Sequence, residues 1–295
     1  MRVLVTGGSG FIGRNLVESL RHRHEVLAPT HAELELTDAR AVQAWLKANR
    51  PDAIIHGAVK PGHRAAKDLD AIAESNLRMF FALAGDPELC PHMVFLSSGA
   101  VYDAAHYVPK MRETYLGAHV PADANGFSKY VSARYIESVD HVVELRPFGV
   151  FGPQEDYSIR YISNAICRAL LGLPITLRQD RCFDYLWVAD LVRVTEHFLE
   201  RPRSVLEHAA YNVTPDEPAS LLAIAQMVRD LTGADVPIEV GAPGIGVEYS
   251  GDNARLRAEM PDLALTPLRE AVRQLCEWYA ARMESIDPSA VLADG

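Results

Sequence analysis

VLVTGGSGFIG, residues 3–13, is the stretch that decides the fold. Its apolar start is typical of a buried strand, and an amphipathic helical pattern follows over residues 11–21. Glycines between a strand and a helix take backbone angles that other residues avoid, and they let a pyrophosphate approach the main chain. The helix start then offers unpaired N–H groups and a positive dipole end to that anion. The spacing of Gly7, Gly10 and Gly13 in this context favours dinucleotide binding over an ordinary tight turn.

The composition is that of a folded protein with ample material for a core. The chain has 295 residues, 48% of them hydrophobic and 23% charged. A formal net charge of −10 would repel a polyanion, so we expect no nucleic-acid partner. The four cysteines lie far apart without metal-ligand spacing, and we expect scattered thiols and no metal. No apolar run approaches the ~20 residues of a membrane span, and a strand at Arg2 leaves no room for a signal peptide; we expect a cytoplasmic protein without membrane contact.

Strands alternate with helices through the first half of the chain. We expect strands at residues 25–28, 53–56, 92–96 and 142–145, and helices at residues 39–49, 72–84 and 125–138. This alternation predicts an α/β fold, a Rossmann-type doubly wound parallel sheet, with residues 1–151 as the dinucleotide-binding domain. Residues 152–295 should form mainly a smaller α/β substrate lobe. Its expected parts are helices at 159–171, 188–199, 221–231 and 267–282, strands near 183–186 and 210–213, a loop at 241–251 and a frayed tail after residue 286.

Open α/β sheets bind ligands beyond the carboxyl ends of their strands. After the second strand, residues 28–31 (APTH) contain no acid that would repel a 2′-phosphate, whereas Arg14, Thr30 and His31 could receive one. The cofactor is therefore NAD or NADP, with a lean towards NADP. After the third strand, the small residues of GAVK, 57–60, would let a cofactor lie against the backbone, although plain packing explains them equally well.

Two residues in this half suit hydride transfer at a carbinol. That reaction needs a base, a donor that polarises the carbonyl oxygen, and a cation that sets the pKa of the base. Ser98, in a loop after the fourth strand, fits the role of the donor, and Lys129 fits the role of the cation.

Together these motifs resemble the extended short-chain dehydrogenase/reductase family, the NAD-dependent epimerase/dehydratase group that acts on nucleotide sugars. The resemblance also rests on SSGAVY at 97–102, LRPFGVFGP at 145–153 and FDYLWVAD at 183–190. It implies that FDYLWVAD is a return strand which rejoins the first domain with the following helix, near 183–200, and that a homodimer forms through the helices near 72–84 and 127–138. It implies a cofactor site made by Gly7, Gly10, Phe11, Ile12, Gly13, Arg14, Asp38, Ala39, Gly57, Ala58, Val59, Lys60, Asn76, Lys129 and Phe148, with Asp38 at the adenine.

Three positions depart from the family pattern. The tyrosine base stands four residues before the lysine in the family, and that position here is Asn125, whose carboxamide cannot become a phenolate. Gly149 replaces an asparagine that often holds the substrate. Phe183 replaces an arginine that contacts the nucleotide diphosphate; Arg178 or Arg181 could substitute. The substrate-binding set is therefore Ser98, Gly149, Arg160, Arg181 and Arg255.

These departures leave alternatives open. The first is NAD(P)-dependent epimerisation, dehydration or keto-reduction of a nucleotide-linked sugar, with Ser98, Lys129 and Asn125 as the catalytic positions. The second is a catalytically silent protein that binds cofactor or nucleotide sugar. The third is a reductase of a small carbonyl compound. Candidates for a replacement acid or base are Tyr102, Tyr107, Tyr115 and Asp123.

Overall fold

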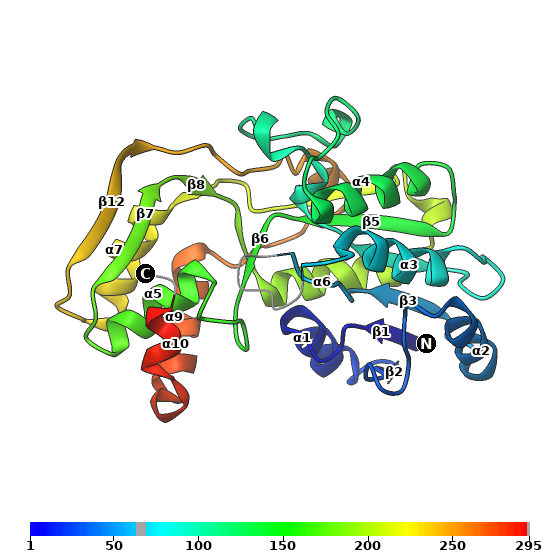
Figure 1. Ribbon diagram of the computed structural model, residues 1–295, viewed down its shortest axis with the longest axis horizontal. Helices are drawn as coiled ribbons and strands as arrows, with labels where there is room; N and C mark the ends of the chain where they lie inside the picture. Colours follow the sequence, from blue (N-terminus) through cyan, green and yellow to red (C-terminus); the bar gives the residue numbers. More distant parts are fainter. Residues whose placement is uncertain (63–68, 294–295) are drawn as a thin grey trace.

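The computed structural model describes residues 1–62 and 69–293, which form two lobes joined side by side (Figure 1). In the larger lobe, the described residues build a sheet of six strands with parallel pairing throughout. Its spatial order is β10 (Ala210–Val213), β5 (Val142–Pro147), β4 (Met93–Leu96), β3 (Ala53–His56), β1 (Arg2–Thr6) and β2 (Glu25–Leu27). From β1 the chain goes first to β2 on one side of the sheet and then to β3 on the other side. Such sheets bind ligands at this switch point between β1 and β3. The predicted Rossmann-type doubly wound sheet is confirmed.

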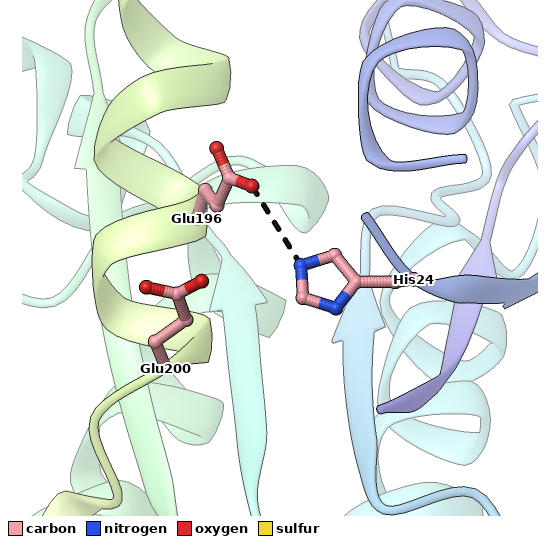
Figure 2. Close-up of side chains that lie close together, drawn as sticks. All are labelled: His24, Glu196 and Glu200. Carbon is pink, nitrogen blue, oxygen red and sulfur yellow. Dashed lines mark ion pairs between the residues drawn. The ribbon is translucent and has the colours of Figure 1, made fainter. Parts of the chain in front are cut away.

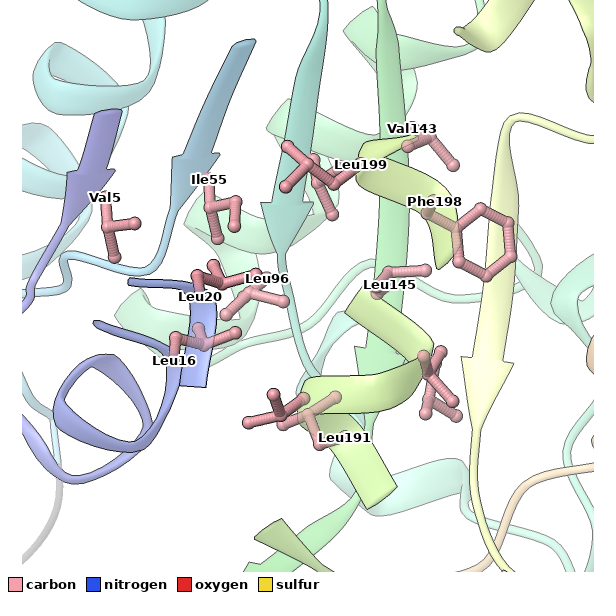
Figure 3. Packing of buried hydrophobic residues seen from close by; sticks show 14 of the residues in the cluster. Val5, Leu16, Leu20, Ile55, Leu96, Val143, Leu145, Leu191, Phe198 and Leu199 are labelled. Atoms are coloured by element: carbon pink, nitrogen blue, oxygen red, sulfur yellow. The ribbon is translucent and has the colours of Figure 1, made fainter. Parts of the chain in front are cut away.

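Helices cover both faces of this sheet. Successive residues of a strand point to opposite faces, so each strand contributes to both cores. Val3 and Val5 belong to the core beneath α1 and α6, whereas Leu4 belongs to the core on the other face. Figure 3 shows Leu16 and Leu191 of these two helices against the first face. The helices of the larger lobe are α1 (Phe11–Leu20), α2 (Ala39–Asn49), α3 (Ile72–Ala84), α4 (Ala124–Ile136) and α6 (Val188–Leu199).

The expected return strand does not enter the large sheet. Its residues form two short strands, β8 (Cys182–Phe183) and β9 (Tyr185–Trp187). Strand β8 pairs with β11 (Ala219–Ser220), and β9 pairs with β6 (Gly149–Phe151). The reason is that β10 already occupies the edge beside β5. Helix α6, which follows β9, does pack against the large sheet.

The smaller lobe has its own core, in which helices α5, α7 and α9 surround residues such as Ile166, Ile224 and Leu275. Its helices are α5 (Tyr161–Leu170), α7 (Leu221–Thr232), α9 (Leu268–Ala280) and α10 (Pro288–Leu292); α8 (Ala254–Glu259) instead lies against β10 of the large sheet. A parallel pair, β7 (Ile175–Asp180) and β12 (Ile238–Ile245), flanks them. Short 3-10 helices complete the fold: η1 (Gly99–Val101), η2 (Ala104–His106), η3 (Glu113–Tyr115), η4 (Arg203–Val205) and η5 (Met283–Ser285).

Two expectations for this lobe are wrong. The loop expected at 241–251 is a strand as far as Ile245, because β7 supplies the backbone partners and an edge strand tolerates Pro243. The tail expected to fray contains α10, whose N-terminus is capped by the side chain of Asp287 and started by Pro288. None of the helices in the described ranges is both long and apolar enough to span a membrane.

Candidate functional site

A cleft of about 580 Å³ opens at the switch point, beyond the carboxyl ends of β1 and β3. This volume is within the range of small-molecule sites, roughly 300–1,000 Å³. The turn after β1, the segment after β2 and the small residues after β3 form its walls. Of the residues expected to bind cofactor, the cleft is lined by Gly7, Gly10, Gly57, Ala58, Val59 and Lys60.

The turn after β1 is shaped by close backbone packing. Gly7 has φ +73°, in the left-handed region that favours glycine. A Cβ on Gly13 would stand 2.0 Å from the carbonyl oxygen of Gly7, so α1 can approach the turn only with glycine there. Helix α1 starts at Phe11, followed by Ile12, and within the described ranges no side chain caps it and no acid lies in its first turn. Its N–H groups are therefore available to an anion.

Asn76 of α3 holds the wall that follows β3. Its Oδ1 accepts a hydrogen bond from the backbone N–H of Lys60 at 2.7 Å, and its Nδ2 donates to the carbonyl oxygen of Lys60 at 3.3 Å. The Lys60 side chain donates to the carbonyl oxygen of Asp70 at 2.6 Å. Asn76 is buried and does not line the cleft itself, so it acts on the cleft through the position of the 57–60 segment.

Two carboxylates, those of Glu33 and Glu35, follow β2, and Glu35 lines the cleft. Glu33 Oε2 accepts hydrogen bonds from the N–H and the hydroxyl of Thr30, at 2.7 and 2.9 Å. Glu35 Oε2 lies 2.8 Å from His31 Nε2, and both of these residues line the cleft. Hydrogen bonds to Thr30 lower the pKa of Glu33, and hydrogen bonds to Thr37 lower the pKa of Glu35, so both are ionised at neutral pH. Residues 28–31 contain no acid, as the lean towards NADP assumed, but Glu35 brings a negative charge to the same side of the cleft.

Other residues expected at the cofactor are engaged beside the cleft. The Arg14 guanidinium donates to Gln154 Oε1 at 3.4 Å. The Asp38 carboxylate caps α2 by accepting two backbone N–H groups. Asp38 and Ala39 line a neighbouring hollow rather than the main cleft. The Asp38 carboxylate, which we expected to contact the adenine, is therefore already engaged as a helix cap.

Ser98 and Lys129 both lie at the carboxyl end of β4. The Ser98 Oγ accepts a hydrogen bond from the N–H of Ala100 at 2.9 Å. Lys129, buried on α4, donates to the carbonyl oxygen of Leu96 at 3.3 Å, and its Nζ lies 4.7 Å from the centre of the Phe95 ring. Burial lowers the pKa of Lys129 to about 8, against the smaller opposing effect of a buried glutamate. Part of the amine is therefore neutral in mildly alkaline solution.

Asn125 lies in the first turn of α4, one turn before Lys129. It is partly buried, and its Cβ is 3.3 Å from where a Cβ on Gly62 would stand, so it faces the segment after β3. Its carbonyl oxygen accepts a hydrogen bond from the Ser128 hydroxyl at 2.7 Å.

Three of the four replacement candidates are hydrogen-bonded away from Ser98. The buried Tyr102 hydroxyl donates to Asn212 Oδ1 and accepts from Arg146 Nη1, both at 3.0 Å. Asp123 caps α4. The Tyr115 hydroxyl donates to a backbone carbonyl oxygen at 3.1 Å.

Tyr249, which the sequence analysis missed, places a phenol beside the residue that follows Ser98. Its hydroxyl oxygen lies 2.6 Å from where a Cβ on Gly99 would stand. Its ring centre is 4.7 Å from that of Phe148 and 5.0 Å from that of Tyr107. No local pattern around residue 249 signals this role, because the contact exists only once the chain has folded.

Phe148 and Gly149 lie where β5 passes into β6. Phe148 leaves no room for a side chain on Gly99, since a Cβ there would stand 2.7 Å from its ring. A Cβ on Gly149 would stand 2.5 Å from the carbonyl oxygen of Asp184. The backbone at Asp184 therefore fills the space next to Gly149.

The three candidate phosphate arginines are not brought together. The Arg181 guanidinium lies over the Phe183 ring, 4.4 Å from its centre. Arg160 is exposed immediately before α5. Arg255 Nε lies 3.6 Å from Glu113 Oε2, beside the first residue of β10, which is the amino end of that strand. Arg255 therefore lies at the β10 edge of the sheet, whereas the cleft lies between β1 and β3.

Among the described residues, one trio of side chains has its ligand atoms close enough for a metal ion: His24, Glu196 and Glu200, within 4.8 Å of one another (Figure 2). Arg23 already pairs with both carboxylates, at 2.7 Å to Glu196 and 2.8 Å to Glu200. A guanidinium in this place neutralises the charge that would attract a cation. The trio is therefore a salt-bridge cluster between α6 and the segment after α1.

Comparison with known proteins places this geometry in a wider context. The model of the NAD dependent epimerase/dehydratase family matches residues 3–214. GDP-L-fucose synthase from Azorhizobium caulinodans is 38% identical over 72 residues, which are 24% of this chain and 23% of that protein. ADP-L-glycero-D-manno-heptose-6-epimerase from Cupriavidus pinatubonensis is 25% identical over 96% of this chain and 99% of its own length. The solved structure of a GDP-mannoheptose C4 reductase from Campylobacter jejuni with NADP bound has a TM-score of 0.81 at 19% identity, covering 95% of this chain and 98% of that one.

Proposed function

The chain belongs to the NAD dependent epimerase/dehydratase family, and on this premise we propose that it binds NAD or NADP and modifies a nucleotide-linked sugar. Membership confirms the resemblance that the sequence motifs predicted. The observation that carries the proposal is the cleft at the switch point, where the glycine turn faces the segment held by Asn76. The names of the full-length relative and of the matched reductase support the substrate class, since both denote enzymes of nucleotide-linked heptoses.

In this proposal each part of the site has one task. Gly7, Gly10 and the first turn of α1 hold the pyrophosphate with backbone N–H groups. When bound, the nicotinamide ring supplies or accepts a hydride. Ser98 donates a hydrogen bond to the reacting oxygen of the sugar, and Lys129 lies towards the nicotinamide ribose. Arg160 and Arg181 are proposed for the diphosphate of the sugar nucleotide, whereas the pairing of Arg255 with a glutamate argues against that role.

For the choice of cofactor, we propose that NAD binds at least as tightly as NADP. Glu35 lines the cleft, is ionised and would repel a 2′-phosphate. The lean towards NADP rested on Arg14, Thr30 and His31 and on the lack of an acid in residues 28–31. In the structure Arg14 donates to Gln154, and Thr30 and His31 pair with Glu33 and Glu35.

The test is calorimetric titration of purified protein with NAD⁺, NADH, NADP⁺ and NADPH, followed by turnover on a panel of nucleotide sugars and nucleotide 4-keto sugars. Saturable binding of a dinucleotide and oxidation, reduction or epimerisation of one panel member are expected. Absence of binding at millimolar dinucleotide would overturn the proposal.

Asn125 favours a second candidate, a catalytically silent protein that senses cofactor or nucleotide sugar. Binding of both ligands without turnover on the panel would support it, and turnover that disappears in Ser98→Ala would exclude it. Phe183, in the place of an arginine, motivates a third candidate, a reductase of small carbonyl compounds. Competition by UDP, GDP or dTDP for substrate would count against that one.

We also propose a homodimer through α3 and α4, which pack against each other. Phe81 on α3 is 38% exposed and Phe127 on α4 is 40% exposed, so both offer apolar surface for a second copy. Light scattering should give twice the chain mass, and Phe127→Glu should give a monomer. A wild-type monomer at micromolar concentration would refute the proposal.

A further inference from the structure

We propose that His31 decides between NAD and NADP by its protonation state: the cleft favours NAD while the imidazole is neutral and accepts the 2′-phosphate of NADP once the imidazole is protonated. The inference rests on the proposed dinucleotide binding and adds a residue that makes the choice of cofactor depend on pH. Its basis is the ion pair of His31 with Glu35, both of which line the cleft.

The turn that carries His31 and Glu35 is fixed to the larger lobe. The N–H groups of Glu33 and Leu34 both donate to the carbonyl oxygen of Thr30 at 3.0 Å, which closes the turn. The Leu34 side chain is buried and belongs to the core that α2 and α3 share with the sheet. The pair is therefore held at the wall of the cleft, although the imidazole itself is largely exposed to solvent.

The Glu35 carboxylate has one oxygen fixed by the backbone and the other at the imidazole. Its Oε1 accepts hydrogen bonds from the N–H and the hydroxyl of Thr37, at 2.8 and 2.6 Å. Its Oε2 lies 2.8 Å from His31 Nε2. The hydrogen bonds to Thr37 lower the pKa of Glu35, so the carboxylate stays negatively charged at neutral pH. The imidazole thus lies beside a constant negative charge.

The position of this pair suits contact with the adenosine ribose. In dinucleotide-binding folds, a carboxylate roughly 20 residues after the glycine turn lies at the ribose 2′-hydroxyl. Glu35 follows Gly13 at a comparable spacing. NAD carries a neutral hydroxyl at this position, whereas NADP carries a phosphate with a charge of about −1.5 to −2. The charge of the pair therefore acts on NADP and leaves NAD nearly unaffected.

The two ring nitrogens of His31 explain why one proton is enough to change the preference. A neutral imidazole has one N–H donor, and with Glu35 accepting at Nε2 the other nitrogen, Nδ1, can only accept. Neither Nδ1 nor the carboxylate then offers a hydrogen bond to a phosphate. A protonated imidazole neutralises the carboxylate and carries a second donor at Nδ1, which can bond the 2′-phosphate.

The other charged groups around the pair keep their charge in the same pH range. Of the described residues that line the cleft, Lys60 is the one with an ionisable side chain besides the pair, and it lies on the wall after β3. Beside the cleft are Glu33 in the turn, Asp38 as the cap of α2, and Arg14 on α1. Carboxylates, amines and guanidinium groups ordinarily keep their charge between about pH 6 and 8.5, whereas an imidazole changes its charge there.

Calorimetric titration with NAD⁺ and NADP⁺ at about pH 6 and about pH 8.5 tests the inference. We expect the ratio of the NADP⁺ Kd to the NAD⁺ Kd to be about 3- to 10-fold lower at the lower pH. His31→Gln should lose most of this change; what remains reports the 2′-phosphate, which itself titrates near pH ~6. His22→Gln is the matched control, since it removes an exposed imidazole that does not line the cleft, and it should behave as the wild type.

A wild-type ratio that does not change with pH, or an equal change in His31→Gln and His22→Gln, would overturn the inference. Protons give a second readout, because a ligand that favours the charged imidazole must take up protons when it binds. Titrations of NADP⁺ near neutral pH in buffers of different ionisation enthalpy should show less uptake in His31→Gln than in His22→Gln, and equal uptake would overturn the inference as well. Failure of the proposed function would look different, as absence of binding of either dinucleotide at both pH values.

Discussion

Replacing Gly13 with alanine tests whether the close approach of α1 to the turn makes the dinucleotide site. A Cβ at position 13 would stand 2.0 Å from the carbonyl oxygen of Gly7, 2.7 Å from its carbonyl carbon and 2.8 Å from the Cα of Gly8. All three neighbours are backbone atoms, so no side chain can rotate away. Carbon contacts are comfortable only near ~3.5 Å, and the methyl group must therefore move α1 and the turn apart by about 1 Å or more.

The size of the effect follows from that displacement. Overpacking of this kind costs about 1–3 kcal/mol, of which the better helix propensity of alanine returns up to ~1 kcal/mol. With about 2–4 °C for each kcal/mol in a chain of this size, the melting temperature should fall by a few degrees. The loss of dinucleotide affinity should be larger than the loss of stability, because the N–H groups of α1 move away from the pyrophosphate. Loss of one or two hydrogen bonds to a charged group, at about 1.5–3 kcal/mol each, weakens dinucleotide binding by roughly 10-fold or more.

Calorimetric titration with NAD⁺ and a thermal melt measure the two effects on the same sample. Ser19→Ala is the control, since Ser19 is exposed on α1 and does not line the cleft. We expect the control to melt and to bind NAD⁺ much as the wild type does. A Gly13→Ala protein that binds NAD⁺ as tightly as Ser19→Ala would refute the reasoning.

Three further variants test other parts of the site. Burial holds the pKa of Lys129 at about 8 in the folded protein, against 10.5 in the unfolded chain, so Lys129→Met should be more stable at pH 7 by up to about 3 kcal/mol. In urea unfolding this advantage should shrink as the pH rises from 8 through 10.5, because there the unfolded wild type binds the extra proton. Glu33→Gln with Glu35→Gln should tighten NADP⁺ several-fold and leave NAD⁺ nearly unchanged in calorimetry; equal changes for both would contradict the repulsion. Asn125→Tyr should raise kcat on the nucleotide-sugar panel, and no gain would show that a phenol one turn before Lys129 cannot reach the substrate.

The parts of the fold that the sequence predicted are those specified locally. The glycine turn and the bounds of α2 and α3 follow from neighbouring residues and agree with the structure. Strand β12 does not, because its glycines and Pro243 suit a loop and only the distant β7 makes it a strand. The last helix was recognisable from Asp287 and Pro288, a common helix start. We expected a frayed tail there because the segment lies near the end of the sequence.

The residues of the candidate site also divide into those that the sequence predicts and those that depend on distant contacts. The positions of Ser98 and Lys129 at the end of β4 follow from the order of strands and helices. Tyr249 could not be found, since its contact with Gly99 depends on how the segment after β12 crosses back over the larger lobe. Glu35 was within reach of sequence reasoning, and a window four residues longer after β2 would have included it. Arg255 looked available for phosphate only because its partner Glu113 is distant in the chain.

The completion of the large sheet by β10 and α6 also bears on how the chain emerges from a ribosome. When residues 1–151 have been made, β5 has no neighbour on its outer edge, and Val143 and Leu145 on one face lack the cover that α6 later provides. The nascent chain therefore exposes an unpaired edge and an apolar face through the synthesis of much of the second lobe. The two lobes should form as one cooperative unit late in translation, and binding by a holding chaperone in that interval would guard the edge of β5 against pairing with another chain.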